Sequence, residues 1–197
     1  MVTLVAGLIL FLGVHSVRVF AEGWRARVIA QRGERLWKAG VAVLSIVGFV
    51  LILQGWGPAR AETVGFWAPP RWTHDVAGLL TLIAFVLVVA AYVPGNAIKA
   101  RLHDPMILGV KAWAFGHLLA NGTVADIVLF GSFLAWAVLD FRAARGRRLA
   151  AGADAAPVAV RSGRTAVAVL VGIVAWAVFA FWLHQRWIGV APFGMHG

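Results

Sequence analysis

The chain has 197 residues, of which 61% are hydrophobic and 13% are charged, and its formal net charge is +10. So small a polar fraction cannot cover the surface of a water-soluble globule of this length, which excludes the soluble classes of protein. Cysteine is absent. Disulfides, thiolate metal ligands and covalent c-type haem attachment are therefore excluded as well.

Six apolar stretches are long enough, at roughly 20 residues, to cross a bilayer as helices. Their composition is apolar on all sides and lacks the period-two alternation of membrane barrel strands. The sequence therefore predicts an all-α polytopic membrane protein, in which residues 1–197 form one domain with a bundle of six transmembrane helices. The predicted spans are residues 2–21, 37–56, 74–94, 105–121, 122–141 and 165–188.

The ends of these spans carry further signals. Residues 1–21 are expected to be the first span and not a secretory signal, because no basic segment precedes them and Arg18 interrupts their end. Asn121 and Gly122 predict a tight turn between the fourth and fifth spans. Residues 146–163, with their Ala, Gly and Pro, predict a flexible cytoplasmic linker before the last span.

Basic residues are distributed unevenly among the connections. Fifteen of the 18 Lys and Arg residues lie at the first, third and fifth connections, and only Arg60, Arg71 and Arg186 lie on the other side. The positive-inside rule then predicts cytoplasmic odd-numbered connections and periplasmic termini in a bacterial inner membrane. Orientation and contact with anionic lipid explain the net charge, so no nucleic-acid partner is expected. Tryptophans near the helix ends are expected to form interfacial belts.

Ionisable groups within the first span need a separate explanation, because each costs about 2.5 to 3.5 kcal/mol on membrane-insertion scales. His15, Arg18 and Glu22 are three and seven residues apart and would share one face of a helix. Arg18 and Glu22 could form an ion pair at the cytoplasmic interface. His15 lies about two turns deeper and is a candidate functional residue.

The fourth span carries a second group, in "LHDPMILGVKAWAFGHLLANG". His103, followed by Asp104 and Pro105, is typical of a helix start. Lys111 and His117 are six residues apart and point in different directions, so one helix cannot combine them into a dyad. The remaining histidines are expected to be solvated or interfacial; they are His74, His184 and His196.

Two buried histidines on different helices, in a chain without cysteine and with few carboxylates, suit the axial ligation of a haem iron. His15 and His117 would be the ligands, and Arg18, Lys111 or Lys99 could neutralise the propionates. Alternatively, the histidines only form hydrogen bonds to neighbouring helices. No GxSxG, HExxH or P-loop motif occurs, so a hydrolase or NTPase has no motif to support it.

At these residues the chain resembles the NnrU family of membrane proteins. The matching stretches are "GLILFLGVHSVRVFAEGWR", "AYVPG", "HDPMILGVKAWAFGHLLANG" and "DIVLFGSFLAWAVLDFRAARGRR", which span about residues 4–190. The resemblance implies an association with bacterial denitrification, in particular with nitrite and nitric oxide reduction.

The family is also similar to 15-cis-zeta-carotene isomerase, a membrane enzyme thought to hold haem b between two histidines. That similarity implies haem b ligation by His15 and His117, the positions that match its ligands. Ala114 stands where the isomerase has a cysteine that can replace one histidine, so the ligand switch of that enzyme is not expected here. A weaker likeness to small membrane methyltransferases fails, because residues 140–154 lack the paired glutamates.

Depth in the membrane argues against a simple haem geometry. Counted from the cytoplasmic face, His15 lies roughly 10 Å deep and His117 roughly 20 Å deep. Helix tilt or a skewed haem plane would have to absorb this difference. Pairing His15 with His103 would give a mismatch of similar size in the opposite direction.

Three functions remain open. The leading prediction is a haem b protein with a redox or nitric-oxide-related role, in which Arg18, Lys111 and Asn121 contact the ligands or propionates. The second is a haem-dependent cis-trans isomerase of an isoprenoid, which needs a long apolar cavity beside the iron. The third is a haem-free assembly factor for membrane reductases. Membrane lipid is an expected partner, whereas the oligomeric state is left open.

Overall fold

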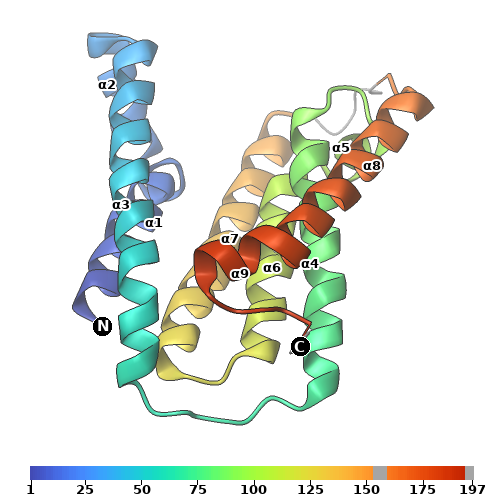
Figure 1. The fold of residues 1–197 in the computed structure, drawn as a ribbon. Coiled ribbons are helices and arrows are strands. Elements are labelled where there is room, and N and C mark those ends of the chain that lie inside the picture. Colours follow the sequence, from blue (N-terminus) through green and yellow to red (C-terminus); the bar gives the residue numbers. More distant parts are fainter. Residues whose placement is uncertain (153–158, 194–197) are drawn as a thin grey trace.

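The computed structural model describes residues 1–152 and 159–193, and these form a bundle of long helices (Figure 1). The described residues contain no β-strand, only one isolated bridge between Gly65 and Thr123. In chain order, the helices are α1 (Val2–Phe20), α2 (Glu22–Arg32), α3 (Glu34–Glu62), α4 (Arg71–Tyr92), α5 (Ala97–Leu102), α6 (Pro105–Ala120), α7 (Val124–Ala150), α8 (Ser162–Val178), the π-helix η2 (Phe179–Leu183) and α9 (His184–Ile188).

The predicted all-α membrane bundle is confirmed. Within the described residues, five helical segments are long and apolar enough to cross a membrane, and α6 is a shorter apolar helix. The last segment runs without interruption through α8, η2 and α9. The chain is therefore a multi-pass membrane protein, and lipid is the medium that its exposed apolar side chains contact.

Several boundaries differ from the sequence prediction. The first connection is itself helical, because α2 follows α1 after a break at Ala21. Glu22 therefore begins a new helix and does not continue the face of His15. Glu22 pairs with Arg25 at 2.7 Å, and not with Arg18, the partner that the sequence offered as one possibility. Helix α7 continues to Ala150 and α8 starts at Ser162, so both ends of the expected linker are helical. Within that linker, residues 153–158 lie outside the described part.

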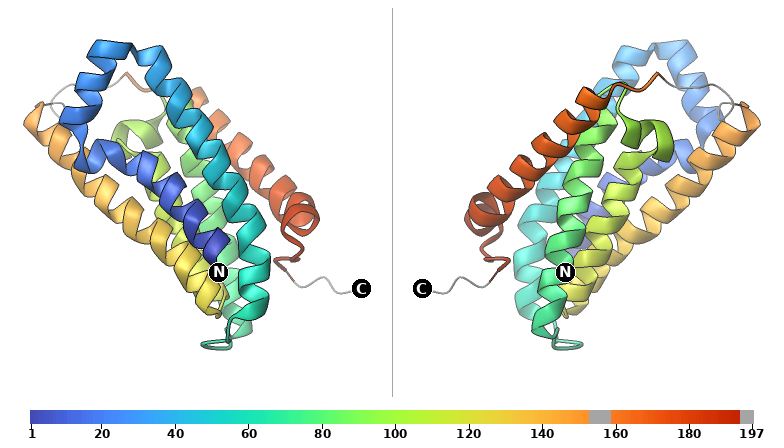
Figure 2. Two further views of the ribbon diagram at one scale, coloured as in Figure 1. Left: turned by 90° about the vertical axis from the view of Figure 1, so that its left-hand side faces the viewer. Right: turned by 90° about the vertical axis from the view of Figure 1, so that its right-hand side faces the viewer.

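Close packing of small residues joins the helices in pairs. Helices α1 and α3 lie side by side, α4 packs against α6 and α8, and α7 contacts both α1 and α6 (Figures 1 and 2). A Cβ atom at Gly55 would lie 2.4 Å from the backbone nitrogen of Leu4. A Cβ at Gly172 would lie 2.6 Å from the Cα of Val86. Glycine at these positions therefore lets the backbones approach, which is how helices gain contact in lipid.

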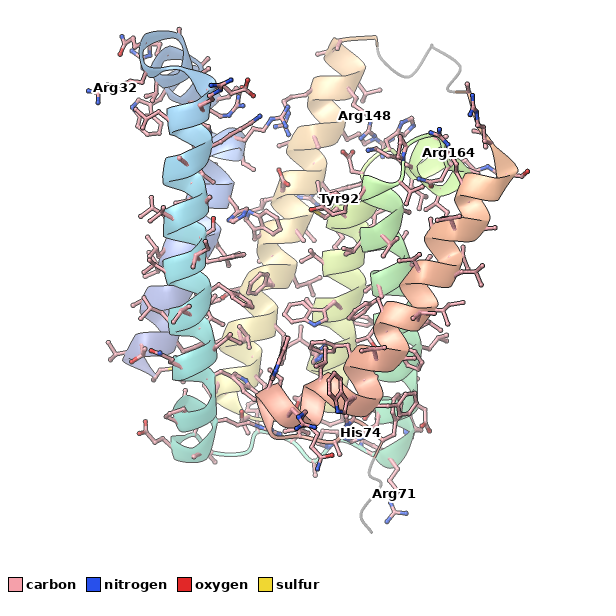
Figure 3. The ribbon with its side chains drawn as sticks, turned by 45° about the horizontal axis from the view of Figure 1, so that its top comes forward. Arg32, Arg71, His74, Tyr92, Arg148 and Arg164 are labelled. Atoms are coloured by element: carbon pink, nitrogen blue, oxygen red, sulfur yellow. The ribbon has the colours of Figure 1, made fainter. Side chains whose placement is uncertain are left out.

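The two ends of the bundle differ in charge. Figure 3 shows Arg32, Arg148 and Arg164 at one end, and Arg71 and His74 at the other. At the basic end, Arg148 forms an ion pair with Asp104, the residue that precedes α6. Arg164 donates a hydrogen bond to the carbonyl of Pro94 at 2.9 Å, which ties the start of α8 to the end of α4.

At the opposite end, the long connection between α3 and α4 docks onto the turn between α6 and α7. The amide of Phe66 donates to the carbonyl of Gly122 at 2.5 Å, and the indole of Trp67 donates to the carbonyl of Asn121 at 3.1 Å. A Cβ atom at Gly122 would lie 1.9 Å from the Trp67 carbonyl oxygen, so only glycine fits. The predicted turn at Asn121 and Gly122 is confirmed.

Replacing Gly7 by valine should force α1 and α3 apart. A Cβ at this position would lie 2.7 Å from the backbone nitrogen of Ile52, which cannot move as a side chain could. Overpacking of this kind costs about 1 to 3 kcal/mol. Thermal unfolding in detergent, followed by tryptophan fluorescence, should show a lower midpoint for Gly7→Val. Gly13→Val on the same helix, where nothing lies within 4 Å, is the matched control; equal midpoints for the two variants would contradict this packing.

Candidate functional site

A partly open cavity of about 570 Å³ lies toward the end of the bundle opposite the basic residues. Side chains of α3, α4, α6, α7 and the segment from α8 to α9 line it, and so does the returning chain at residues 190–193. Its walls are mostly aromatic and aliphatic, and the polar side chains on them are few. Those polar side chains are Arg60, His74, Thr81, His117, Asn121 and His184, together with the indoles of Trp56, Trp113, Trp176 and Trp187.

His117 stands on the wall formed by α6. Its Nδ1 lies 2.8 Å from the carbonyl oxygen of Trp113, one turn earlier. A carbonyl oxygen only accepts, so Nδ1 carries a proton, and in the neutral imidazole Nε2 then keeps its lone pair. The ring also stacks on Phe130 of α7, with 4.6 Å between centroids. The imidazole is therefore held in one orientation with a free basic nitrogen, the form in which histidine binds metals.

His184 reaches the same cavity from the C-terminal segment. Its Nδ1 lies 2.7 Å from the carbonyl oxygen of Val190, which again leaves Nε2 with the lone pair. The ring packs edge-on against Phe179, with 5.7 Å between centroids. The sequence predicted an interfacial or solvated position for His184, whereas the structure places it half-buried on the cavity wall. His74 also lines the cavity but is exposed, in keeping with the solvated position predicted for it.

A polar network closes one end of the cavity. Asp126 is completely buried, and its carboxylate accepts hydrogen bonds from the Trp56 indole at 3.1 Å and from the Thr123 hydroxyl at 2.7 Å. Arg60 lies 3.6 Å from the same carboxylate. Its guanidinium also donates to the Asn121 side chain at 3.4 Å. Because a buried carboxylate is costly unless it is paired, Arg60 and Trp56 are held at this end of the cavity.

Asn121 connects this network to the candidate ligand. Its side-chain nitrogen donates to the backbone carbonyl of His117 at 2.9 Å. Of the five residues that the sequence predicted for the site, the structure brings together two at the cavity, His117 and Asn121.

His15 lies outside the cavity lining. Its Nδ1 lies 2.7 Å from the carbonyl oxygen of Phe11, and its ring stacks on that of Phe11 at 4.5 Å. Phe11 in turn contacts Phe133 at 5.7 Å, and Phe133 forms part of the cavity wall. His15 therefore lies behind this wall, and a chain of ring contacts through Phe11, Phe133 and Trp113 links it to His117.

Arg18 and Lys111 also lie away from the cavity. The backbone carbonyl of Arg18 accepts a hydrogen bond from Arg147 at 3.3 Å, near the basic end. The ammonium of Lys111 lies 3.8 Å from the ring centroid of Phe141 on α7, in a cation–π contact. The structure thus does not bring Arg18 or Lys111 together with His117.

Two cavity residues were missed by sequence reasoning, Arg60 and His184. A signal for Arg60 existed, since Arg60 and Asp126 carry opposite charges at the same predicted end of two spans. Opposite charges at equal depth in a bilayer are expected to pair. No comparable signal existed for His184, because its direction depends on a π-helical turn that sequence patterns do not indicate. Within residues 1–152 and 159–193, no group of three or more His, Asp or Glu side chains could hold a bare metal ion.

Comparison with known protein families identifies a match. The family model described as "NnrU protein" matches residues 3–192, which is nearly the whole chain. No curated protein matches, and no solved structure matches. The match covers the described membrane-spanning helices apart from Val2, the first residue of α1, and all the cavity-lining residues apart from Phe193. The chain belongs to the NnrU family.

Proposed function

We propose that this membrane protein binds haem b in the cavity, with His117 as an axial ligand. The observation that carries the proposal is the His117 imidazole, which lines an apolar cavity with Nδ1 bound to a carbonyl and Nε2 free. The cavity volume of about 570 Å³ lies within the range for sites of small molecules and cofactors. Haem b supplies one-electron redox chemistry and the binding of small gases.

The other cavity residues fit the two parts of a haem. Its apolar ring matches aromatic walls such as Trp113, Phe130 and Phe179. The two haem propionates could pair with the guanidinium of Arg60, which faces the cavity from α3 and has a half-buried side chain. Asn121 offers a further polar contact beside Arg60. A redox or nitric-oxide-related role in denitrification, which the family resemblance implies, is the cellular function that we propose for this site.

The pairing of His15 with His117, implied by the resemblance, stays a prediction. One observation favours a ligand near His15: the indole nitrogen of Trp136 is buried without a hydrogen-bond partner among the described residues, and its ring meets His15 edge-on at 6.0 Å. However, a haem held by both histidines would require Phe11 and Phe133 to leave their present positions, because their rings form part of the contact chain from His15 to the cavity wall. Arg18 and Lys111 would contact the haem propionates only if the haem were held by both His15 and His117.

A haem-dependent isomerase of an isoprenoid is the second candidate function. The observation that favours it is the apolar lining of the cavity, which would accept a hydrocarbon chain beside the iron. The extraction of a polyene or quinone with the purified protein would support this candidate. A haem-free assembly factor for membrane reductases is the remaining alternative, in which the histidines only pack.

The distribution of basic residues supports an orientation of the bundle across the membrane. We place the end with Arg32, Arg148 and Arg164 in the cytoplasm of a bacterial cell, following the positive-inside rule (Figure 3). Both termini and the polar end of the cavity would then face the periplasm.

Haem binding by His117 can be tested directly on the purified protein. Wild-type protein from haem-replete cells should show a Soret band, because His117 supplies a neutral imidazole. His117→Ala should lose the band or shift it, since the ligand is gone. His74→Ala, at an exposed position of the same cavity, is the matched control and should keep the wild-type spectrum. A colourless, well-folded wild-type protein would favour the assembly factor.

The role of Arg60 can be separated from its contact with Asp126. In the double variant Arg60→Ala, Asp126→Asn, no buried carboxylate loses its partner, and the cation at the cavity is removed. Haem affinity, measured by titration of the haem-free protein, should fall roughly tenfold to a hundredfold, the worth of a charged hydrogen bond. Asp126→Asn alone and Arg71→Ala are the controls. Haem dimethyl ester, which has no carboxylates, should bind wild type and double variant equally; an equal loss for both ligands would mean that Arg60 acts only on the fold.

A further inference from the structure

We infer that His184 is the second axial ligand, which binds the iron from the C-terminal segment while His117 binds it from α6. This inference rests on the proposed function, since it names a further residue of the same haem site. It replaces His15, the partner that the family resemblance implies.

The two histidines, His184 and His117, line one cavity, and their rings make the same kind of backbone hydrogen bond. Each Nδ1 is bound to a backbone carbonyl oxygen, at 2.7 Å in His184 and 2.8 Å in His117. In the neutral form, each Nε2 therefore keeps a lone pair that can bind a metal ion.

The second support is the π-helix that directly precedes His184. Residues 179–183 form i→i+5 hydrogen bonds, so this turn holds about one residue more than an α-turn. The extra residue reduces the rotation between Trp176 and His184, and both side chains consequently line the cavity. Phe181 and Trp182, within the same turn, are instead exposed. Single π-turns of this kind are frequent at functional sites.

The third support is the way in which the chain returns and holds His184. Gly189 has φ 79°, a left-handed conformation that ends α9 and turns the chain back. The turn brings the Val190 carbonyl to His184. Phe193 then packs on Gly78 of α4, where a Cβ atom would lie 2.7 Å from the phenyl ring. This return fixes the imidazole without occupying its Nε2.

The remaining histidines near the cavity are less suitable. His74 is exposed, and in the structure it stands at the end of the bundle (Figure 3). His15 lies behind the wall that Phe133 forms. His184 is half-buried and held by a hydrogen bond, so it alone of the three combines access to the cavity with a fixed orientation.

The test is the spin state of ferric haem in the full-length protein in detergent. Visible and electron paramagnetic resonance spectra should show a six-coordinate low-spin iron in wild type. His184→Ala should keep the haem through His117 but become high-spin. Added imidazole should then restore the low-spin spectrum by entering the space left by the side chain, and this rescue shows that the variant is folded. His15→Ala, the control, should keep the wild-type spectrum.

The outcomes separate this inference from the proposed function. If His184→Ala keeps the low-spin spectrum while His15→Ala becomes high-spin, the ligand comes from α1 and the inference is wrong, although haem binding stands. If His184→Ala and His15→Ala both leave the spectrum unchanged, neither residue is the ligand and the inference is again wrong. If wild type and His117→Ala both fail to bind haem, the proposed function fails together with the inference.

Discussion

The cost of an unsatisfied polar group in lipid decides the layout of this protein. No water is available in the hydrocarbon core, so each ionisable side chain within a span must meet a partner inside the bundle. Asp126 shows this constraint most clearly, because it is completely buried and draws Trp56, Arg60 and Thr123 toward itself. The same network holds Asn121 against His117. Polar groups are thereby collected at one end of an otherwise apolar cavity.

Small residues make the rest of this layout possible. Glycines in α1, α3 and α8 bring helices so close that a single added Cβ would meet backbone atoms. Helix α3 of the α1–α3 pair and both helices of the α4–α8 pair contribute side chains to the cavity, and α6 and α7 complete its wall. A large cavity in a small protein thus depends on tight packing on both sides, where van der Waals contact replaces the hydrophobic effect.

Much of the fold could be predicted from the sequence, because apolar length and charge asymmetry are properties of the chain itself. Five of the predicted spans correspond to long apolar helices and the fourth to the shorter α6, and the turn at Asn121 and Gly122 and the helix start at Pro105 also agree with the structure. The first connection could not be predicted, since a break at Ala21 separates Glu22 from the helix of His15. The position of His184 on the cavity wall could not be predicted either, because the π-turn at residues 179–183 changes which side chains face inward. The hydrogen bond from the Trp56 indole to Asp126 also had no signal in the sequence, where Trp56 was only one of the tryptophans near a helix end.

We propose that an iron centre lies at His117 inside this cavity. The decisive measurement is a structure of the haem-loaded protein in a lipid nanodisc, with the iron located by its anomalous scattering or by its density. We predict iron about 2 Å from the Nε2 atom of His117, with the porphyrin between α6 and the segment of η2 and α9. Iron located between α1 and α7, or a cavity that holds only lipid while haem is bound elsewhere, would contradict it.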